Sequence, residues 1–459
     1  MRTHVDLPVS LSRDSADPLT AQLAGWLRRA MLDGTLAPGE RLPSTRALAA
    51  QLAVSRTVVT EAYQQLYAEG WLDGRHGSGT FVADMEQAPR PPGRSTYVPA
   101  PPPPPADSVD LTSGRPWVRD YDRAAWKRAW RRAADLEPGD SPDPYGLPRL
   151  REQLAEHLRR ARGMAVGPEN VLVTRGTGNG IDLCALALLA PGDRAGVEDP
   201  GYRVARNVFA ARGAEVVPCP VDEDGVIVDG LPGDLRLLYT TPAHQFPLGG
   251  RLPIPRRERL LAWARSTGAT IVEDDYDAEF RYDVAPLPAL YGLDPSRVVL
   301  LGTLSKILAP DVGVGWLVGA PELLARIAGL RDEVADRTSG PVQQAVATML
   351  ECGDLDRHLR RMRLEYARRR AAIVELLGPV CRLHGDTAGL HVLAELPEAV
   401  VPGVVGRAAE RGVLLDSTHR HHHGGPRLHG LVIGYGSASL ADVRRGCRVL
   451  AGLIRECRS

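Results

Sequence analysis

Lysine is almost absent from this chain. Of its 56 lysine and arginine side chains only Lys127 and Lys306 are lysines, so the other 54 are arginines. Arginine keeps its charge in proteins, whereas a buried lysine can lose its proton and act as a nucleophile. A lysine kept in such a chain raises the question of whether it forms a covalent bond.

Other absences exclude whole classes of protein. The six cysteines form no CxxC pair, which argues against a zinc site and against a disulfide framework. No apolar run reaches the roughly 18 residues that span a membrane, and the N-terminal "MRTHVDLPVSLSRDS" lacks the apolar segment of a signal peptide. The formal net charge is zero, so bulk charge does not indicate nucleic acid. We expect a cytoplasmic protein with no membrane partner.

The length of 459 residues predicts about three domains. Between Asp84 and Ala106, nine prolines and almost no aliphatic side chains predict an extended linker, because such a segment cannot bury a core. We therefore expect a first domain over residues 1–83 and a Pro-rich linker over residues 84–108.

The first domain has the pattern of a winged helix-turn-helix. Apolar residues at helical spacing from Leu19 to Met31 predict a helix, which the glycines and prolines of "DGTLAPGERLP" end. Ser44 and Ser55 can cap two shorter helices on either side of a tight turn. The following "WLDGRHGSGTFV" is typical of a two-stranded wing.

In a helix-turn-helix the second helix enters the major groove by its first residues, here Ser55, Arg56 and Thr57, and Arg46 can reach a phosphate. The same geometry also occurs in helical domains that bind no DNA. The stretch from "DGTLAPGERLPSTRALAAQL" to "GSGTFVA" resembles the DNA-binding domain of GntR-type transcription regulators. This resemblance implies contacts with double-stranded DNA that also involve the wing-tip residues His76 and Gly77.

From Val109 to Ser459, apolar strands such as "NVLVTRG", "EVVPCPV", "ATIVEDDY" and "RVVLLGT" alternate with helical segments. This alternation predicts a mostly parallel sheet with helices on both faces. Ligands of such sheets bind at the carboxyl ends of the strands. Four clusters of unusual residues follow predicted strands there.

The first cluster, in "VTRGTGNGIDLCALALL", places Thr177 and Gly178 at the start of an apolar helix, where free amides can bind an anion. Glycine turns before helices are also common without any ligand. The second cluster is "EDPGY", where Tyr202 either stacks on a flat ligand or simply packs.

The third cluster, "IVEDDYDAEFRYD", crowds carboxylates at a strand end. It suggests either a metal site or an aspartate beside a heterocyclic N–H⁺. In the fourth, "VLLGTLSKILAP", Lys306 follows Thr303 and Ser305, and its retention favours a Schiff base. The alternative is that a lysine is kept with no such role, which is one interpretation of Lys127 in "AAWKRAW".

These clusters, in this order, resemble the fold-type I aminotransferases that bind pyridoxal 5′-phosphate (PLP). With the N-terminal domain attached, the chain is identified as a member of the MocR subgroup of GntR-type regulators; its most specific strings are "TTPAHQFPLG", "EDDYDAEFRYD" and "GTLSKILAP". The resemblance implies an α/β fold with an aminotransferase-like large domain over residues 109–345 and a small C-terminal domain over residues 346–459.

The resemblance also implies roles for single residues. Lys306 would form the Schiff base with PLP, Asp274 would hold the pyridinium nitrogen and Tyr276 would lie near the ring hydroxyl. The remaining implied cofactor-binding residues are Tyr202 on the ring, Thr177, Gly178, Thr303 and Ser305 around the phosphate, and His244 and Gln245 along the pocket.

The sequence departs from the family pattern at two places. Gly313 replaces the arginine that usually binds the cofactor phosphate, and Leu431 or Val432 stands where aminotransferases keep a substrate-carboxylate arginine, with Arg427 slightly upstream. The His419–His423 loop in "STHRHHHGG" suggests a metal, but its glycines favour a flexible polar loop, so no metal site is predicted.

We therefore expect a homodimeric, PLP-responsive transcription regulator whose sensor domain is not used as an enzyme, with vitamin B6 synthesis genes as targets on family grounds. PLP acts alone or with an amine or amino-acid effector. One alternative is a working aminotransferase with a DNA-binding domain, which the missing carboxylate arginine disfavours. The other is a scaffold that has lost its cofactor.

Overall fold

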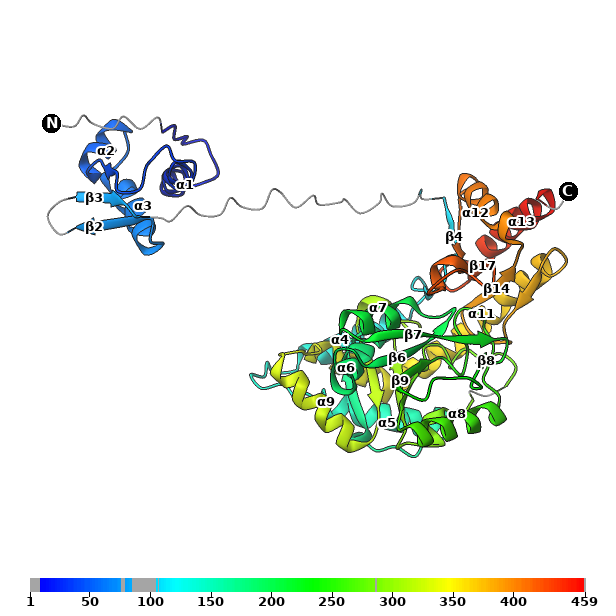
Figure 1. Ribbon diagram of the computed structural model, residues 1–459. Coiled ribbons are helices and arrows are strands. Elements are labelled where there is room, and N and C mark those ends of the chain that lie inside the picture. The colour runs from blue at the N-terminus through cyan, green and yellow to red at the C-terminus, as the bar shows by residue number, and fades with distance from the viewer. Residues whose placement is uncertain (1–8, 76–78, 85–104, 106, 285–286, 458–459) are drawn as a thin grey trace. The chain divides into compact units, whose positions relative to one another are not determined.

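The computed structural model describes residues 9–75, 79–84, 105, 107–284 and 287–457 (Figure 1). The chain divides into two compact units, Met1–Pro102 and Pro103–Ser459. Most of the predicted linker lies outside the described residues, as do His76 and Gly77. In the described part, no helix is long and apolar enough to cross a membrane.

The N-terminal unit is a winged helix-turn-helix. Its strands form one antiparallel sheet in the order β1-β3-β2, and α1 and α2 pack against α3. Leucines of all three helices, such as Leu27, Leu48 and Leu66, are fully buried in its core. The elements are α1 (Leu19–Leu32), β1 (Arg41–Leu42), α2 (Thr45–Gln51), α3 (Arg56–Ala68), β2 (Leu72–Arg75) and β3 (Gly79–Val82).

Side-chain caps define the two helices of the turn, as the sequence predicts. Ser44 Oγ accepts a hydrogen bond from the Ala47 amide at 3.2 Å, and Ser55 Oγ accepts one from the Val58 amide at 3.4 Å. Ala53 turns the chain between the helices with a φ of 53°, in the left-handed region. Residues 55–57 consequently lie at the exposed start of α3.

The second unit contains an eight-stranded sheet in the order β5-β12-β11-β10-β9-β6-β7-β8. Neighbours from β11 through β7 are parallel, so the predicted parallel sheet is confirmed. Strand β12 (Gly315–Val318) lies antiparallel between β5 and β11 and was not predicted, because it is short and begins in a glycine-rich stretch. The other strands are β5 (Val171–Thr174), β6 (Arg194–Asp199), β7 (Glu215–Asp222), β8 (Gly225–Val226), β9 (Leu235–Thr240), β10 (Thr270–Asp274) and β11 (Val298–Thr303).

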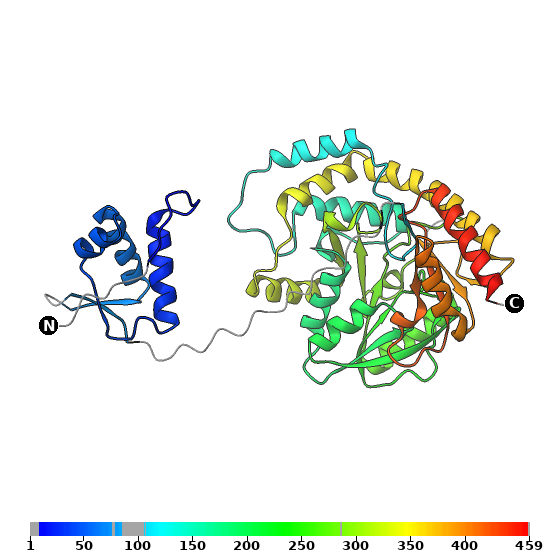
Figure 2. The same cartoon turned by 90° about the horizontal axis from the view of Figure 1, so that it is seen from above.

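Helices cover both faces of this sheet because both faces are apolar. Side chains such as Val272 and Leu301 pack in one cluster with α6, α7 and α9, whereas Ile271 and Leu300 pack in another with α5, α8 and α10. Figure 2 shows these helices around the sheet. Their bounds are α5 (Pro148–Arg162), α6 (Thr177–Leu188), α7 (Arg203–Ala211), α8 (Ile254–Thr267), α9 (Pro321–Glu333) and α10 (Gly340–Glu351), and α4 (Arg123–Ala134) packs on α10.

The C-terminal part forms a second sheet in the order β13-β14-β17-β16. Strand β4 (Val109–Asp110) pairs with β15 (Val413–Leu414), so the start of the unit lies beside the C-terminal elements (Figure 1). The domain boundary expected at residue 345 falls inside α10 and remains a prediction. The remaining elements are α11 (Asp354–Leu377), β13 (Arg382–His384), β14 (His391–Glu395), α12 (Val401–Glu410), β16 (Asp416–Ser417), β17 (Gly430–Gly434) and α13 (Leu440–Glu456), with short 3₁₀ turns that include η3 (Pro310–Val312) and η5 (Thr418–His421).

Candidate functional site

A cavity of about 630 Å³ lies where β9, β10 and β11 end and α6 begins. Parallel strands bring their carboxyl ends to one edge of the sheet, which explains why segments far apart in the sequence meet there. Eight of the ten predicted cofactor-binding residues line the cavity: Thr177, Gly178, Tyr202, Asp274, Tyr276, Thr303, Ser305 and Lys306.

Lys306 presents a largely buried amine to this cavity. Its Nζ donates a hydrogen bond to the Gly114 carbonyl at 2.5 Å, and the backbone beside it is held by His358, whose Nε2 contacts the Ile307 carbonyl at 2.8 Å. Burial lowers the pKa of the Lys306 ammonium, while the charges of Asp274 and Asp277 oppose that change. The amine therefore loses its proton more readily than an exposed lysine does.

Asp274 has one carboxylate oxygen bound and one free. Oδ2 accepts a hydrogen bond from the Tyr239 hydroxyl at 2.5 Å, whereas buried Oδ1 has no partner among the described residues. Burial raises the pKa of Asp274 to about 7. A protonated ring nitrogen fits this site, because it donates to the free oxygen and stabilises the ionised carboxylate.

The start of α6 faces Thr303 and Ser305 across the cavity. A Cβ placed on Gly176 would lie 3.6 Å from Ser305 Oγ and 3.7 Å from Thr303 Oγ1, so the three residues border a common space. Buried Thr177 Oγ1 has no partner in the described part of the chain. Free helix amides, hydroxyl donors and an unused buried hydroxyl together fit a phosphate.

His244 and Gln245 do not line the cavity, contrary to the expectation from the sequence. His244 lies behind Tyr276: its Nδ1 is 3.1 Å from the Tyr276 hydroxyl and 2.9 Å from Asp277 Oδ2, and the hydroxyl donates to the His244 carbonyl at 3.0 Å. The amide nitrogen of Gln245 donates to Glu198 Oε2 at 3.1 Å. Both side chains point to buried partners and hold the walls in place.

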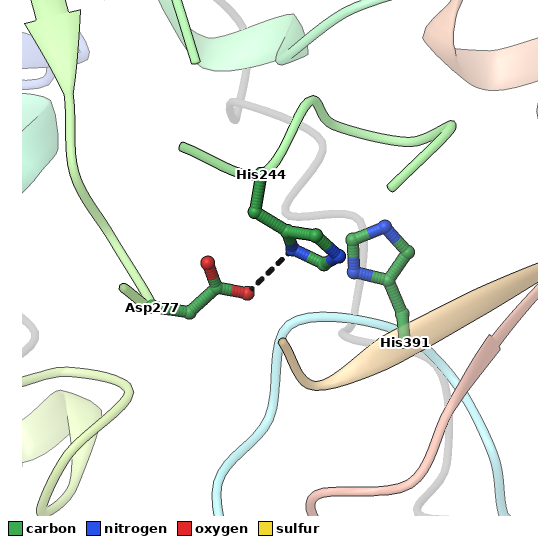
Figure 3. Close-up of side chains that lie close together, drawn as sticks. All are labelled: His244, Asp277 and His391. Carbon is green, nitrogen blue, oxygen red and sulfur yellow. Dashed lines mark hydrogen bonds and ion pairs between the residues drawn. The ribbon is translucent and has the colours of Figure 1, made fainter. Parts of the chain in front are cut away.

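A buried cluster of His244, Asp277 and His391 has potential ligand atoms within 4.8 Å of one another (Figure 3). Asp277 binds the Nδ1 edge of His244 rather than the edge that faces His391. The Gly389 backbone packs so tightly that a Cβ there would lie 1.9 Å from His244 Cε1. This crowding favours a packed hydrogen-bonded pair over a metal site.

Four other carboxylates of "EDDYDAEFRYD" also have protein partners, those of Glu273, Asp275, Asp277 and Asp283. Asp275 forms a buried ion pair with Arg162, and Glu273 accepts hydrogen bonds from the Leu290 and Tyr291 amides at 2.9 and 3.0 Å. These contacts favour the alternative of a buried aspartate beside a heterocyclic N–H⁺ over that of a metal site.

The cavity wall also contains residues to which the sequence analysis assigned no cofactor-binding role. Most come from loops and strand ends with no motif of their own, whereas Phe246 belongs to "TTPAHQFPLG" and Arg420 and His421 belong to the His419–His423 loop. They include Ser113, Gly114, Arg115, Arg175, Arg203, Tyr239, Phe246, His391, Arg420 and His421.

Gly313 is not among the lining residues, whereas Arg175, directly before Gly176, is. Arg175 Nη2 forms an ion pair with Asp336 at 2.8 Å. On β17, Leu431 and Val432 are fully buried in the apolar core. Any anchor for an anionic ligand must therefore come from another element.

The histidine-rich loop is more ordered than the sequence predicts. Residues 418–421 form η5, and His421 and His422 are 7% and 6% exposed. His421 lies on the cavity wall and its carbonyl accepts a hydrogen bond from the Gly201 amide at 2.9 Å. Burial against neighbouring elements outweighs the flexibility suggested by the flanking glycines.

In the N-terminal unit, Arg46, Ser55, Arg56 and Thr57 are all exposed. Arg56 Nε contacts Thr45 Oγ1 at 3.4 Å, so the starts of α2 and α3 are adjacent. Thr60, one turn further along α3, donates to the Arg56 carbonyl at 2.9 Å.

Comparison with known proteins identifies the family. Residues 19–82 match the family described as bacterial regulatory proteins of the gntR family, and residues 107–410 match aminotransferase class I and II. The pyridoxine biosynthesis transcriptional regulator PdxR of Corynebacterium glutamicum is 38% identical over 94% of this chain and 95% of its own length. The probable rhizopine catabolism regulatory protein MocR of Rhizobium meliloti is 34% identical over 96% of this chain and 94% of its own length. The chain belongs to the MocR subgroup of GntR-type transcription regulators.

Solved aminotransferase structures resemble the second unit of this MocR-type regulator. The α-aminoadipate aminotransferase LysN of Thermus thermophilus superposes with a TM-score of 0.69 at 27% identity, over 76% of this chain and 92% of that one. An archaeal alanine:glyoxylate aminotransferase gives 0.71 at 26% identity, over 77% and 92%. The predicted fold class, a winged helix-turn-helix joined to a fold-type I aminotransferase-like unit, is confirmed.

Proposed function

We propose that this MocR-type regulator senses PLP in its aminotransferase-like unit and adjusts transcription through its winged helix-turn-helix. The observation that carries the proposal is the presence, in one cavity, of the largely buried Lys306 amine and of Asp274, which has one carboxylate oxygen without a partner among the described residues. PLP carries the complementary groups, an aldehyde for the amine and a ring nitrogen for the carboxylate, and supplies an electron sink when bound.

Each wall residue has a distinct task in this proposal. Lys306 would supply the amine that reacts with the cofactor aldehyde, Asp274 would keep a proton on the ring nitrogen, and Thr177 with the α6 amides would hold the phosphate. Tyr202, whose ring lies 6.4 Å from that of Tyr239 at 26°, offers a flat face to the cofactor ring. Tyr276, whose hydroxyl donates to the His244 carbonyl, would lie near the ring hydroxyl of the cofactor.

The DNA half of the proposal concerns a homodimer that binds two half-sites through residues 46 and 55–57. The similarity to a named pyridoxine biosynthesis regulator supports vitamin B6 synthesis genes as the target.

Arg56→Ala should abolish specific retardation of operator DNA, because the exposed guanidinium at the start of α3 is lost. Arg29→Ala, an exposed arginine on α1, is the matched control; equal retardation by both variants would contradict this placement of the recognition helix.

The burial of apolar Leu431 and Val432 supports a sensor rather than an enzyme, because it leaves β17 without a side chain that could bind a substrate carboxylate. We expect negligible amino transfer between amino acids and keto acids. Turnover at ordinary aminotransferase rates, roughly 1–10³ s⁻¹, would instead support the alternative of an active enzyme.

The direct test of the cofactor is a visible absorption spectrum of the purified protein with added PLP. Wild type and Lys127→Ala should show the absorbance of a protein Schiff base, and reduction with borohydride should fix the label on residue 306. Lys306→Ala should show free PLP only. Because Lys127 is the only other lysine and is exposed, the pair separates a specific site from general amine reactivity.

A further inference from the structure

Asp277 and His244 form a buried pair behind Tyr276, outside the cavity that Tyr276 lines. Each of the two side chains is 2% exposed, and Asp277 Oδ2 lies 2.9 Å from His244 Nδ1 (Figure 3). The same nitrogen lies 3.1 Å from the Tyr276 hydroxyl. A single histidine atom therefore connects a buried carboxylate with a residue of the proposed cofactor site. Burying such polar groups costs free energy that an apolar pair would not cost.

The chain around Tyr276 alternates between the cavity and the protein interior. Asp274 and Tyr276 line the cavity, whereas Asp275 and Asp277 each form a buried contact with a side chain of another segment. The Phe246 ring packs edge-on against Tyr276, with the ring centroids 6.3 Å apart. The neighbours of Tyr276 in the chain and in space thus fix where its side chain lies.

The contacts of His244 determine which ring nitrogen carries its proton. An ionised carboxylate only accepts hydrogen bonds, so Nδ1 must donate to Asp277. A proton on Nε2 would be buried without an acceptor, because that atom has no partner among the described residues. The Gly389 backbone holds the ring in place, since a Cβ there would lie 1.9 Å from Cε1. His244 is therefore assigned the form with its proton on Nδ1 and none on Nε2.

The Nδ1 proton lies between Asp277 and the Tyr276 hydroxyl oxygen, and both can accept it. The Tyr276 hydroxyl donates its own proton to the His244 carbonyl at 3.0 Å. Burial raises the pKa of Tyr276 well above its usual value, as do the charges of Asp277 and Asp274, so the hydroxyl keeps that proton. A hydroxyl that accepts one hydrogen bond is polarised and becomes a stronger donor.

We propose that Asp277 and His244 are positioning residues that hold the Tyr276 hydroxyl as a donor for the ring oxygen of the ligand. The site then selects a pyridine aldehyde by the oxygen beside its aldehyde group, and not only by the aldehyde, the ring nitrogen and the phosphate. The proposal rests on the PLP-sensing function above and names a group of the ligand that decides selection. On binding, the Tyr276 proton turns from the His244 carbonyl to that oxygen.

The test compares PLP with its 3-deoxy analogue, which keeps the aldehyde, the ring nitrogen and the phosphate but lacks the ring hydroxyl. Affinities come from absorbance titrations of the full-length protein. Both compounds are also titrated with a free alkylamine, because the ring hydroxyl stabilises a Schiff base by itself. The preference of wild type for PLP should exceed that of the free amine roughly 10- to 100-fold, since a hydrogen bond to a charged oxygen is gained. His244→Leu and Tyr276→Phe should lose most of this excess.

Two further variants separate positioning from packing. His244→Asn places an amide nitrogen where Nδ1 stands, so it should keep the preference that His244→Leu loses. Asp283→Asn, at an exposed residue of the same segment, should behave as wild type does. In the PLP-free protein, NMR of ¹⁵N-labelled histidine should show a proton on Nδ1 of His244 and none on Nε2. The loss of this signal in His244→Asn assigns it.

The possible results are distinct. Equal preference of wild type and the free amine, an unchanged preference in His244→Leu or Tyr276→Phe, or a proton on Nε2 would overturn the proposal. Parallel losses of both affinities at an unchanged ratio would show that His244 only supports the fold, and would overturn it as well. If His244→Leu does not fold, Tyr276→Phe carries the affinity test. Failure of wild type to bind PLP would contradict the sensor function instead, whereas the proton on Nδ1 is measured without PLP.

Discussion

Asp274 illustrates how one buried atom indicates a ligand. Its Oδ1 is buried without a partner among the described residues, and the side chain lines a cavity that also holds a lysine. Burial, together with the charges of Asp275 and Asp277, raises the pKa of this carboxyl to about 7. We expect Asp274→Asn to weaken PLP binding roughly 10- to 100-fold, because a hydrogen bond to a charged group is lost. An absorbance titration with PLP measures this, with exposed Asp283→Asn as the control. Equal affinity in both variants would show that the ring nitrogen lies elsewhere.

The sequence pattern singled out Lys306 and the carboxylate cluster at a strand end, and the family resemblance implied the roles of Lys306, Asp274 and Tyr276. The three residues line one cavity, while their roles stay predictions. The positions of His244 and Gln245 were not predictable, because their direction depends on Asp277 and Glu198, partners that a linear motif does not reveal. His421 lies in a loop that the sequence singled out for its histidines and predicted to be flexible and polar; the structure places it on the cavity wall.

At the scale of elements, the start of α6 is the candidate phosphate site. It would have to bind the phosphate without help from an arginine at position 313, which is glycine in this chain. Arg175 precedes the helix and lies on the cavity wall. We expect Arg175→Gln to weaken PLP binding about tenfold, since one charge-assisted contact to the phosphate is lost. Arg337→Gln is the control, because Arg337 forms its ion pair with Asp332 and is not on the wall.

Pyridoxal, which lacks the phosphate, provides a second check on this element. Arg175→Gln should leave the affinity for pyridoxal unchanged while that for PLP falls. A parallel loss for both compounds would mean that Arg175 supports the fold of the α6 start rather than the phosphate.

Elements with strong local patterns were predicted and those without were not. The caps Ser44 and Ser55, the strand ends and the glycine turn before α6 are all local signals. Strands β4, β12 and β15 have two to four residues each and depend on pairing with distant partners. Tertiary packing decides such short strands, so their own residues do not indicate them.

At the scale of the whole molecule, the Pro-rich composition of residues 84–108 predicts a separate N-terminal unit, whereas length predicts about three domains and the structure divides into two compact units. The contacts that close the second unit have no signal in the sequence. Asp416 meets Ser113 across a sequence separation of 303 residues, and β15 pairs with β4. These contacts bring the start and the end of the unit to the same cavity wall. No periodicity in the sequence could have indicated that meeting.

The buried carboxyl also predicts how stability depends on pH. Because the pKa of Asp274 is raised from 3.8 to about 7 in the folded protein, the folded state binds more protons than the unfolded state in that range. Stability of the PLP-free protein, taken relative to Asp274→Asn, should therefore fall as the pH rises from 4 to 7. With saturating PLP, the stability of wild type relative to Asp274→Asn should depend less on pH, because a ring N–H⁺ stabilises the carboxylate. Thermal melting of both proteins at several pH values measures it, and a difference that rises with pH would contradict the assignment.

The central claim is that PLP bound at Lys306 changes DNA binding. The most direct measurement is the affinity of the full-length protein for operator DNA, titrated with PLP, for wild type, Lys127→Ala and Lys306→Ala. Linkage between two sites typically changes affinity by roughly 5- to 150-fold. We predict a change of that order for wild type and Lys127→Ala and none for Lys306→Ala. The same PLP response in Lys306→Ala, or no response in wild type, would contradict the account.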